Sequence, residues 1–364
     1  MGMPSIIISF SQKAATALSR GERGIIAIIL KDEYVPETNP CVCLSSGDIP
    51  DGLSEANREQ VRLAMKGYVN LPKKVAVYVI KPGSDGEEGQ DVGAGGYEKA
   101  LAFLSSYRFH WLVVPSVQTD GMAERIVEYV KTERSNNHLI KAVLPDTEAD
   151  SEAVVNFATE KIYAGDKEYD TEEYCSRIAG MIAGTPMSIA TTYAELGEVT
   201  DCTKLTKAQM DDAVDAGKFI IFYDGEKVKT GRAVTSLTTL AADRGKNFQK
   251  IKIMEAMDMI ADDIRTTMED SYIGKYANTY DNKCLLIAAI NNYFASLAKD
   301  NIISSGTVEI DLEANSAYLK ENGEDVSEMG EDEIRMADTG SFVYLKASVK
   351  MLDAIEDIII PISM

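Results

Sequence analysis

The chain has 364 residues, of which 45% are hydrophobic and 26% are charged. This composition is ordinary for a globular protein and excludes a chain that is disordered throughout or a bundle of membrane helices. Its 37 basic and 58 acidic residues give a formal net charge of −21, which argues against binding to nucleic acid or to an anionic membrane. At about 150 residues per domain, the length predicts two or three domains.

The first 24 residues predict a short strand and a linker. Ile6, Ile7, Ile8 and Phe10 form an apolar, β-prone segment, and a polar stretch of small residues follows it. No basic segment precedes a long apolar core, so we expect no secretion signal. A terminal strand of this kind folds back on its own body or joins the sheet of another chain.

Residues 25–240 alternate between strand and helix patterns. Strands are predicted at 25–30, 75–80, 111–115, 140–144 and 218–223, and helices at 97–107, 121–134, 152–158 and 171–182. Strands separated by helical runs of about 10–15 residues are typical of a layered α/β domain.

From residue 249 the pattern changes to two long amphipathic helices. Their apolar stripes are Ile253, Met257, Ile260, Ile264 and Met268, and then Leu286, Ile290, Tyr293 and Leu297. Residues 308–338 carry eleven acidic side chains, which form either a solvated face or a surface for a partner. Residues 342–349 alternate as a strand with two different faces, a helical turn or two is predicted at 351–355, and a second isoleucine-rich strand ends the chain.

The residues needed for catalysis or metal binding are scarce. The five cysteines are scattered, and His110 and His138 are too few to complete a four-ligand zinc site. The odd number of cysteines favours synthesis in a reducing cytosol. Gly93, Gly95 and Gly96 lack the spacing of a dinucleotide-binding loop. We therefore expect no catalytic residue, no metal and no cofactor, and an α/β enzyme of unknown substrate is the alternative.

Several segments carry a resemblance to a known family. The run GRAVTSLTTL at 231–240 and the segments at 250–294, 308–319 and 324–358 resemble the C-terminal domain of phage tail sheath proteins, and the start RGERGI at 20–25 is similar to theirs. The chain looks most like the short sheaths of Gram-positive myophages, defective prophages and R-type bacteriocins. A type VI secretion-like sheath component is a related alternative.

The resemblance implies a fold and an assembly. The expected fold is α/β (α+β), with an N-terminal arm and linker at 1–24, an outer body at 25–240, a tube-proximal sheath domain at 241–350 and an attachment segment with an arm at 351–364. Hexameric rings of this chain would stack around a tail tube and contract without nucleotide. The implied partners are other copies of the chain, the tube protein, and the baseplate and tail terminator proteins. Synthesis in the bacterial cytoplasm and incorporation into a phage tail or bacteriocin particle follow from the same likeness.

The resemblance also suggests which residues make contacts between subunits. The arms would pair with strands of neighbouring subunits through Ile6, Ile7, Ile8 and Phe10, and through Ile358, Ile359, Ile360 and Ile362. The accepting strand would carry Val343, Leu345, Ala347 and Val349. Lys350, Asp353 and Asp357, spaced to share one face of a short helix, are the tube-facing candidates, and the acidic run 321–333 is the second choice. An ordinary solvated helix face is the alternative for these charges.

Overall fold

The computed structural model describes residues 18, 20–83 and 94–364. These residues form two compact units. The body comprises Gly21–Met259 and Asp353–Met364, and the C-terminal unit comprises Ile260–Leu352 together with the described residues up to Arg20. This division by contacts falls after residues 259 and 352, whereas the division by sequence pattern falls after 240 and 350.

A seven-stranded sheet forms the centre of the body. Its strands are β1 (Ile25–Lys31), β2 (Cys41–Cys43), β3 (Lys74–Ile80), β4 (Trp111–Val113), β5 (Lys141–Pro145), β6 (Val154–Phe157) and β10 (Lys218–Phe219). Their order in space is β10-β6-β5-β4-β1-β3-β2, and every neighbouring pair is parallel except β2 with β3. The uncharged runs of the sequence thus become parallel strands that are buried on both faces.

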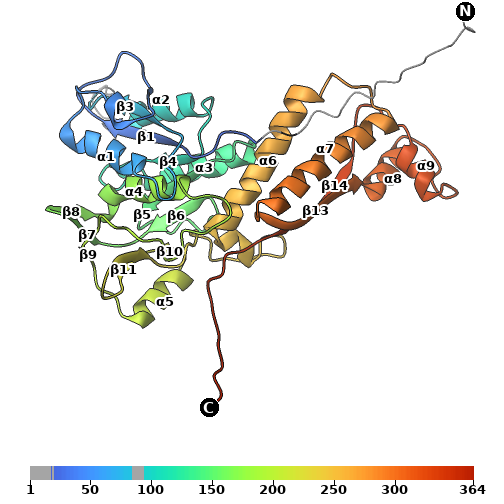
Figure 1. Cartoon of the computed structure of the whole chain (residues 1–364). Coiled ribbons are helices and arrows are strands. Elements are labelled where there is room, and N and C mark those ends of the chain that lie inside the picture. The colour runs from blue at the N-terminus through green and yellow to red at the C-terminus, as the bar shows by residue number, and fades with distance from the viewer. Residues whose placement is uncertain (1–17, 19, 84–93) are drawn as a thin grey trace, which may run out of the picture. The chain divides into compact units, whose positions relative to one another are not determined.

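Helices cover both faces of this sheet (Figure 1). On one face α1 (Glu55–Met65) and α4 (Thr171–Ala183) pack against a core that includes Ile26, Ile28 and Leu30 of β1. On the other, α2 (Ala94–Leu104) and α3 (Ala123–Ser135) pack against a second core that includes Ile25, Ala27 and Ile29. Successive residues of β1 therefore serve opposite cores, and the predicted layered α/β architecture is confirmed.

Smaller elements complete the body. A three-stranded sheet contains β7 (Lys161–Ala164), β8 (Lys167–Asp170) and β9 (Asp201–Cys202), and a hairpin contains β11 (Ile221–Tyr223) and β12 (Val228–Thr230). Helix α5 (Lys207–Asp215) lies between β9 and β10 in the chain, and two 3-10 turns span Ser46–Asp48 and Lys246–Gln249. The helix predicted at 152–158 is wrong. All four residues of β6 there are buried, and an apolar run this short carries no period that separates strand from helix.

The C-terminal unit joins helices to a two-stranded sheet. Helix α6 (Ile251–Ser271) contributes its second half, and α7 (Tyr280–Lys299), β13 (Ile303–Ile310), α8 (Leu312–Glu321), α9 (Glu331–Met336) and β14 (Leu345–Met351) follow. β13 and β14 pair antiparallel, and β13 packs on α7. The two predicted long helices are confirmed. Residues 352–364 form neither helix nor strand, so the short helix predicted at 351–355 is wrong.

Two kinds of feature are absent from the described residues. No helix among them is long and apolar enough to cross a membrane. Within the same residues, no three or more His, Cys, Asp and Glu side chains gather as a metal site would require.

Candidate functional site

One edge of the small sheet is open, and the contacts of Asn291 show which backbone groups lie on it. The side chain of Asn291, on α7, binds both backbone groups of Val308: its Nδ2 donates to the carbonyl at 3.2 Å, and its Oδ1 accepts from the N–H at 2.9 Å. Val308 therefore turns its N–H and C=O away from β14, so its pairing with Ala347 is a non-hydrogen-bonded one. It follows that Ala347 also turns its backbone groups outward, to the far edge of β14.

The same alternation places Leu345 and Val349 on this outer edge, which we call the acceptor edge. Among the described residues β14 pairs only with β13, so the acceptor edge has no strand beside it. Folded proteins usually cover or blunt such an edge, because it is a template for another strand. Three of the four predicted accepting residues thus lie where a strand can be added. The fourth, Val343, lies just before β14 and is 40% exposed.

An apolar groove of about 700 Å³ adjoins the acceptor edge within the C-terminal unit. Its apolar lining comes from both helices and both strands and includes Ile264, Met268, Leu286, Ile290, Val308, Leu345 and Ala347. Because Leu345 and Ala347 belong to β14 itself, the groove continues one face of the sheet. A strand added at the acceptor edge would place alternate side chains over this groove.

The end of the chain exposes a run of isoleucines. Ile358, Ile359, Ile360 and Ile362 are 74%, 92%, 72% and 83% exposed. Contiguous exposed apolar side chains of this kind mark interaction surfaces. We call residues 358–364 the C-terminal arm. Ile6, Ile7, Ile8 and Phe10, the predicted N-terminal arm, lie outside the described residues.

The three tube-facing candidates do not share a helical face. Lys350 is exposed on β14 and forms no salt bridge with any described residue. Asp353 and Asp357 lie in the extended segment after β14, where each binds a cation of the body: Asp353 binds Lys250, and Asp357 binds Arg232 at 2.6 Å. The hydrogen bond from Arg232 holds the pKa of Asp357 below its usual value.

Glu356, which is not one of the three tube-facing candidates, is the most enclosed acid of this segment. Its side chain is 6% exposed, and its carboxylate lies 3.1 Å from Lys250 and 3.5 Å from Arg232. The hydroxyl of Thr192 donates a hydrogen bond to it at 2.5 Å. No local pattern reveals these partners, since Lys250 precedes Glu356 by 106 positions.

The carboxyl end of β1 is the position at which doubly wound sheets usually bind ligands. In this chain it is occupied by polar side chains that bind one another. The order of strands reverses at β1, and ligands usually lie at the carboxyl ends of the strands there. In this chain Lys31 lies 2.5 Å from Asp120, and the hydroxyl of Tyr97 donates to the same carboxylate at 2.6 Å. His110, at the start of β4, accepts a hydrogen bond from the backbone of Ile25. These contacts are structural and do not pair a nucleophile with a base.

Comparisons with known proteins identify the family of the chain. Residues 90–236 match the family model of the phage tail sheath protein central domain, and residues 243–364 match that of the phage tail sheath C-terminal domain. The tail sheath protein of Clostridium phage phiCD119 is 37% identical over 368 residues, covering 100% of this chain and 99% of its own.

Solved structures show the same fold. The sheath tail protein of Desulfitobacterium hafniense has a TM-score of 0.74 at 18% identity, covering 97% of this chain and 98% of its own. The helical sheath of the anti-feeding prophage in its contracted state has a TM-score of 0.71 at 12% identity, covering 100% and 99%. The two family models and the 37% identical relative show that the chain belongs to the phage tail sheath family.

Proposed function

We propose that this protein polymerises as stacked hexameric rings around a tail tube, stores free energy in the extended sheath and contracts to drive the tube through a cell envelope. The observation that carries the proposal is that both features needed for strand exchange are exposed: a segment that can be added as a strand and a strand edge that can receive it. The C-terminal arm is exposed, and the acceptor edge beside the apolar groove has no strand on it among the described residues.

Strand exchange between copies satisfies both features at once. Leu345, Ala347 and Val349 offer three N–H and three C=O groups, and each hydrogen bond contributes about 1 kcal/mol net. Each buried isoleucine adds about 1.5–3 kcal/mol. Association and ordering costs offset much of this gain, so a single link is modest. Many links acting together along a cylinder hold the sheath firmly.

The tube contact has to be weak enough to release when the sheath contracts. Exposed charge pairs of about 0–1 kcal/mol each suit this role better than a broad apolar patch. Lys350 is the candidate for it, because Asp353 and Asp357 already bind Lys250 and Arg232. The baseplate and the tail terminator are the proposed partners at the two ends of the sheath.

The test removes one backbone donor from the acceptor edge. Ala347→Pro deletes the outward N–H of Ala347, and proline is tolerated on edge strands. We expect a folded monomer, by circular dichroism and urea unfolding, that builds no tubes in negative-stain microscopy. Deleting residues 358–364 should have the same effect, whereas the matched control Ala347→Val keeps the N–H and should build tubes. Normal tubes from the proline variant or from the truncated chain would overturn strand exchange.

The energetic part of the proposal has its own test. Sheath protein expressed without tube protein should assemble directly into contracted tubes, with no nucleotide added, because the contracted form is the lower in free energy. Extended tubes alone, or contraction that depends on ATP, would contradict stored conformational energy.

A further inference from the structure

The root of the C-terminal arm is held by a row of alternating charges. From one end to the other the row is Asp353, Lys250, Glu356, Arg232 and Asp357, and each neighbouring pair forms a salt bridge. All five residues belong to the body. We call this row the latch.

The body places the two cations of the latch side by side. A β-bridge pairs Val234 with Lys250, and the N–H of Ile251 binds the carbonyl of Ala233 at 3.2 Å. Arg232 therefore lies close to Lys250, although the two are far apart in the sequence. Thr192 orients the central acid, because its hydroxyl accepts from the N–H of Ala233 at 3.0 Å and donates to Glu356.

Side-chain ion pairs hold residues 353–357 against the body. Directly after β14, the N–H of Leu352 donates a hydrogen bond to the carbonyl of Ile302 at 3.1 Å. Residues 353–357 form no helix or strand. Their path across the body is therefore set by the three carboxylates and the two cations that bind them.

We propose that the latch is a positioning device that sets where the C-terminal arm leaves the body and so aims it at a neighbouring subunit. This inference rests on the proposed strand exchange and adds a way in which the arm is directed to one neighbouring subunit. An arm on a loose root samples many directions, whereas a fixed root raises its effective concentration near one acceptor edge. Asp353 and Asp357 act in this way as internal positioning residues instead of tube contacts.

The charges of the latch agree with such a role. Burial lowers the pKa of Lys250, but its hydrogen bonds to Asp353 and Glu356 outweigh burial and raise it above the usual value. Asp353 and Asp357 are 42% and 72% exposed, whereas Glu356 is 6% exposed. Salt therefore weakens the outer pairs before the central one.

Proteolysis of the full chain measures the latch directly. A glutamyl endopeptidase cleaves after Glu356 only when that side chain leaves its partners, and mass spectrometry detects the released residues 357–364. In the double variant Lys250→Gln, Arg232→Gln we expect release about fivefold faster, a factor that corresponds to about 1 kcal/mol. The control Lys346→Gln, Lys350→Gln changes two exposed lysines of β14 and should cleave at the wild-type rate. Equal rates in the latch variant and the control would overturn the proposal.

Assembly measures the consequence. The variant Arg232→Glu, Lys250→Glu should remain folded by circular dichroism but form no tubes. Adding Asp353→Lys, Glu356→Lys and Asp357→Lys restores every pair with reversed charge and should restore tubes. Failure of this rescue in a folded protein would contradict positioning and favour direct use of the acids at the tube.

The two proposals fail in different ways. If the chain lacking residues 358–364 builds normal tubes, strand exchange is wrong. If that truncation blocks assembly but Arg232→Glu, Lys250→Glu builds normal tubes, only the latch proposal is overturned.

Discussion

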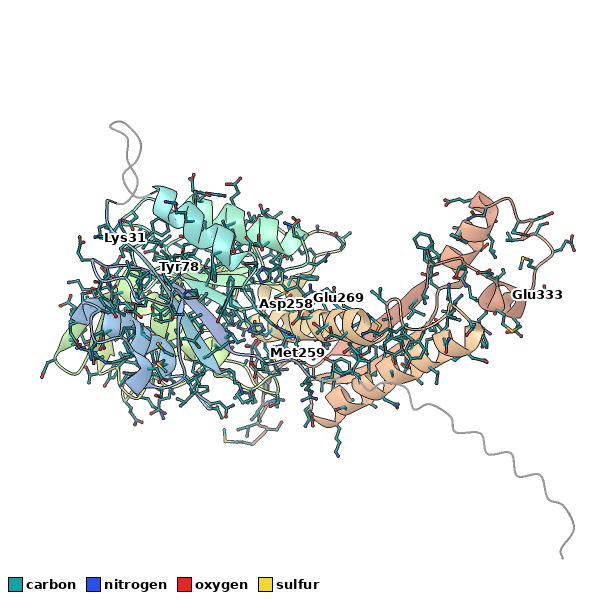
Figure 2. The ribbon with its side chains drawn as sticks, turned by 90° about the horizontal axis from the view of Figure 1, so that it is seen from above. Lys31, Tyr78, Asp258, Met259, Glu269 and Glu333 are labelled. Carbon is teal, nitrogen blue, oxygen red and sulfur yellow. The ribbon has the colours of Figure 1, made fainter. Side chains whose placement is uncertain are left out.

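The guanidinium of Arg134 donates two hydrogen bonds to the carboxylate of Asp258, at 2.8 and 2.9 Å. Asp258 lies on the first half of α6 (Figure 2), is 3% exposed, and also lies 2.6 Å from the ammonium of Lys141. Lys141 in turn lies 2.8 Å from Glu255 and over the ring of Trp111. This buried cluster fastens the start of α6 to α3 and β5 of the body.

Removing the negative charge of Asp258 should destabilise the body strongly. Asp258→Asn leaves Arg134 and Lys141 buried with too little opposite charge, and breaking a buried pair typically costs about 3–5 kcal/mol. Urea unfolding followed by circular dichroism measures the change. The control Asp51→Asn breaks a pair with Arg58 in which Asp51 is 98% exposed, and it should change the free energy of unfolding by less than about 1 kcal/mol. Similar effects of both variants would show that the cluster adds no special stability.

The same cluster predicts how stability depends on pH. Burial would raise the pKa of Asp258, but Lys141 and Arg134 outweigh burial and hold that pKa below its usual value. The ionised carboxylate therefore contributes its full stabilisation above the unfolded pKa of about 3.9 and loses it as the pH falls through the lower folded pKa. We expect the difference in unfolding free energy between wild type and Asp258→Asn to be constant from pH 5 to 8 and to shrink below about pH 4. A difference that grows on acidification would contradict this assignment.

The packing of β13 on α7 predicts a sensitive glycine. A Cβ atom at Gly306 would lie 2.8–3.0 Å from atoms of the Phe294 side chain, so Gly306→Ala should destabilise the C-terminal unit by about 1–3 kcal/mol. In Gly330→Ala, within the same unit, the new atom would lie 3.8 Å from Glu333, an ordinary contact. Thermal unfolding of the two variants measures the contrast, and an equal loss in both would argue against tight packing at Gly306.

The proposed tube contact predicts a selective effect of charge at Lys350. Lys350→Glu should weaken co-assembly with the tube protein at ordinary salt, because it reverses an exposed charge that has no partner among the described residues. Self-assembly into empty contracted tubes should persist. Lys320→Glu reverses an exposed charge on α8 and serves as the control. Extended sheath on tube in normal amounts with Lys350→Glu would place the contact elsewhere, and the acidic run 321–333 would be tested next.

Five of the seven strands of the central sheet, β1, β3, β4, β5 and β10, could be predicted because each is marked locally. An uncharged run such as that of β1 needs cover on both faces, and only helices on both sides of a parallel sheet provide it. The two stripes of α6 and α7 were equally clear, since a 3.6-residue period is local information. β6 was assigned wrongly because its strand state depends on pairing with β5 and β10.

The charges after β14 show a different limit. Asp353 and Asp357 are spaced as neighbours on a helix, but they bind Lys250 and Arg232, which no spacing rule connects to them. Asn291 is likewise an ordinary helical residue until its contact with Val308 is known. Both the charged segment after β14 and the open edge of the small sheet depend on side-chain partners that are far away in the sequence. A single sequence does not reveal such partners.

The two hydrogen bonds between Asn291 and Val308 determine on which side the small sheet can be extended by another strand. A side-chain amide already occupies the flank of β13 at this point, which leaves β14 as the growing side. A strand added to β14 would expose its own outer edge, with which a further strand can pair. Under the proposed strand exchange, two arms that pair with the same subunit would therefore bind in order, because the second arm pairs with the outer edge of the first. Loss of the first arm would then also remove the edge to which the second arm binds.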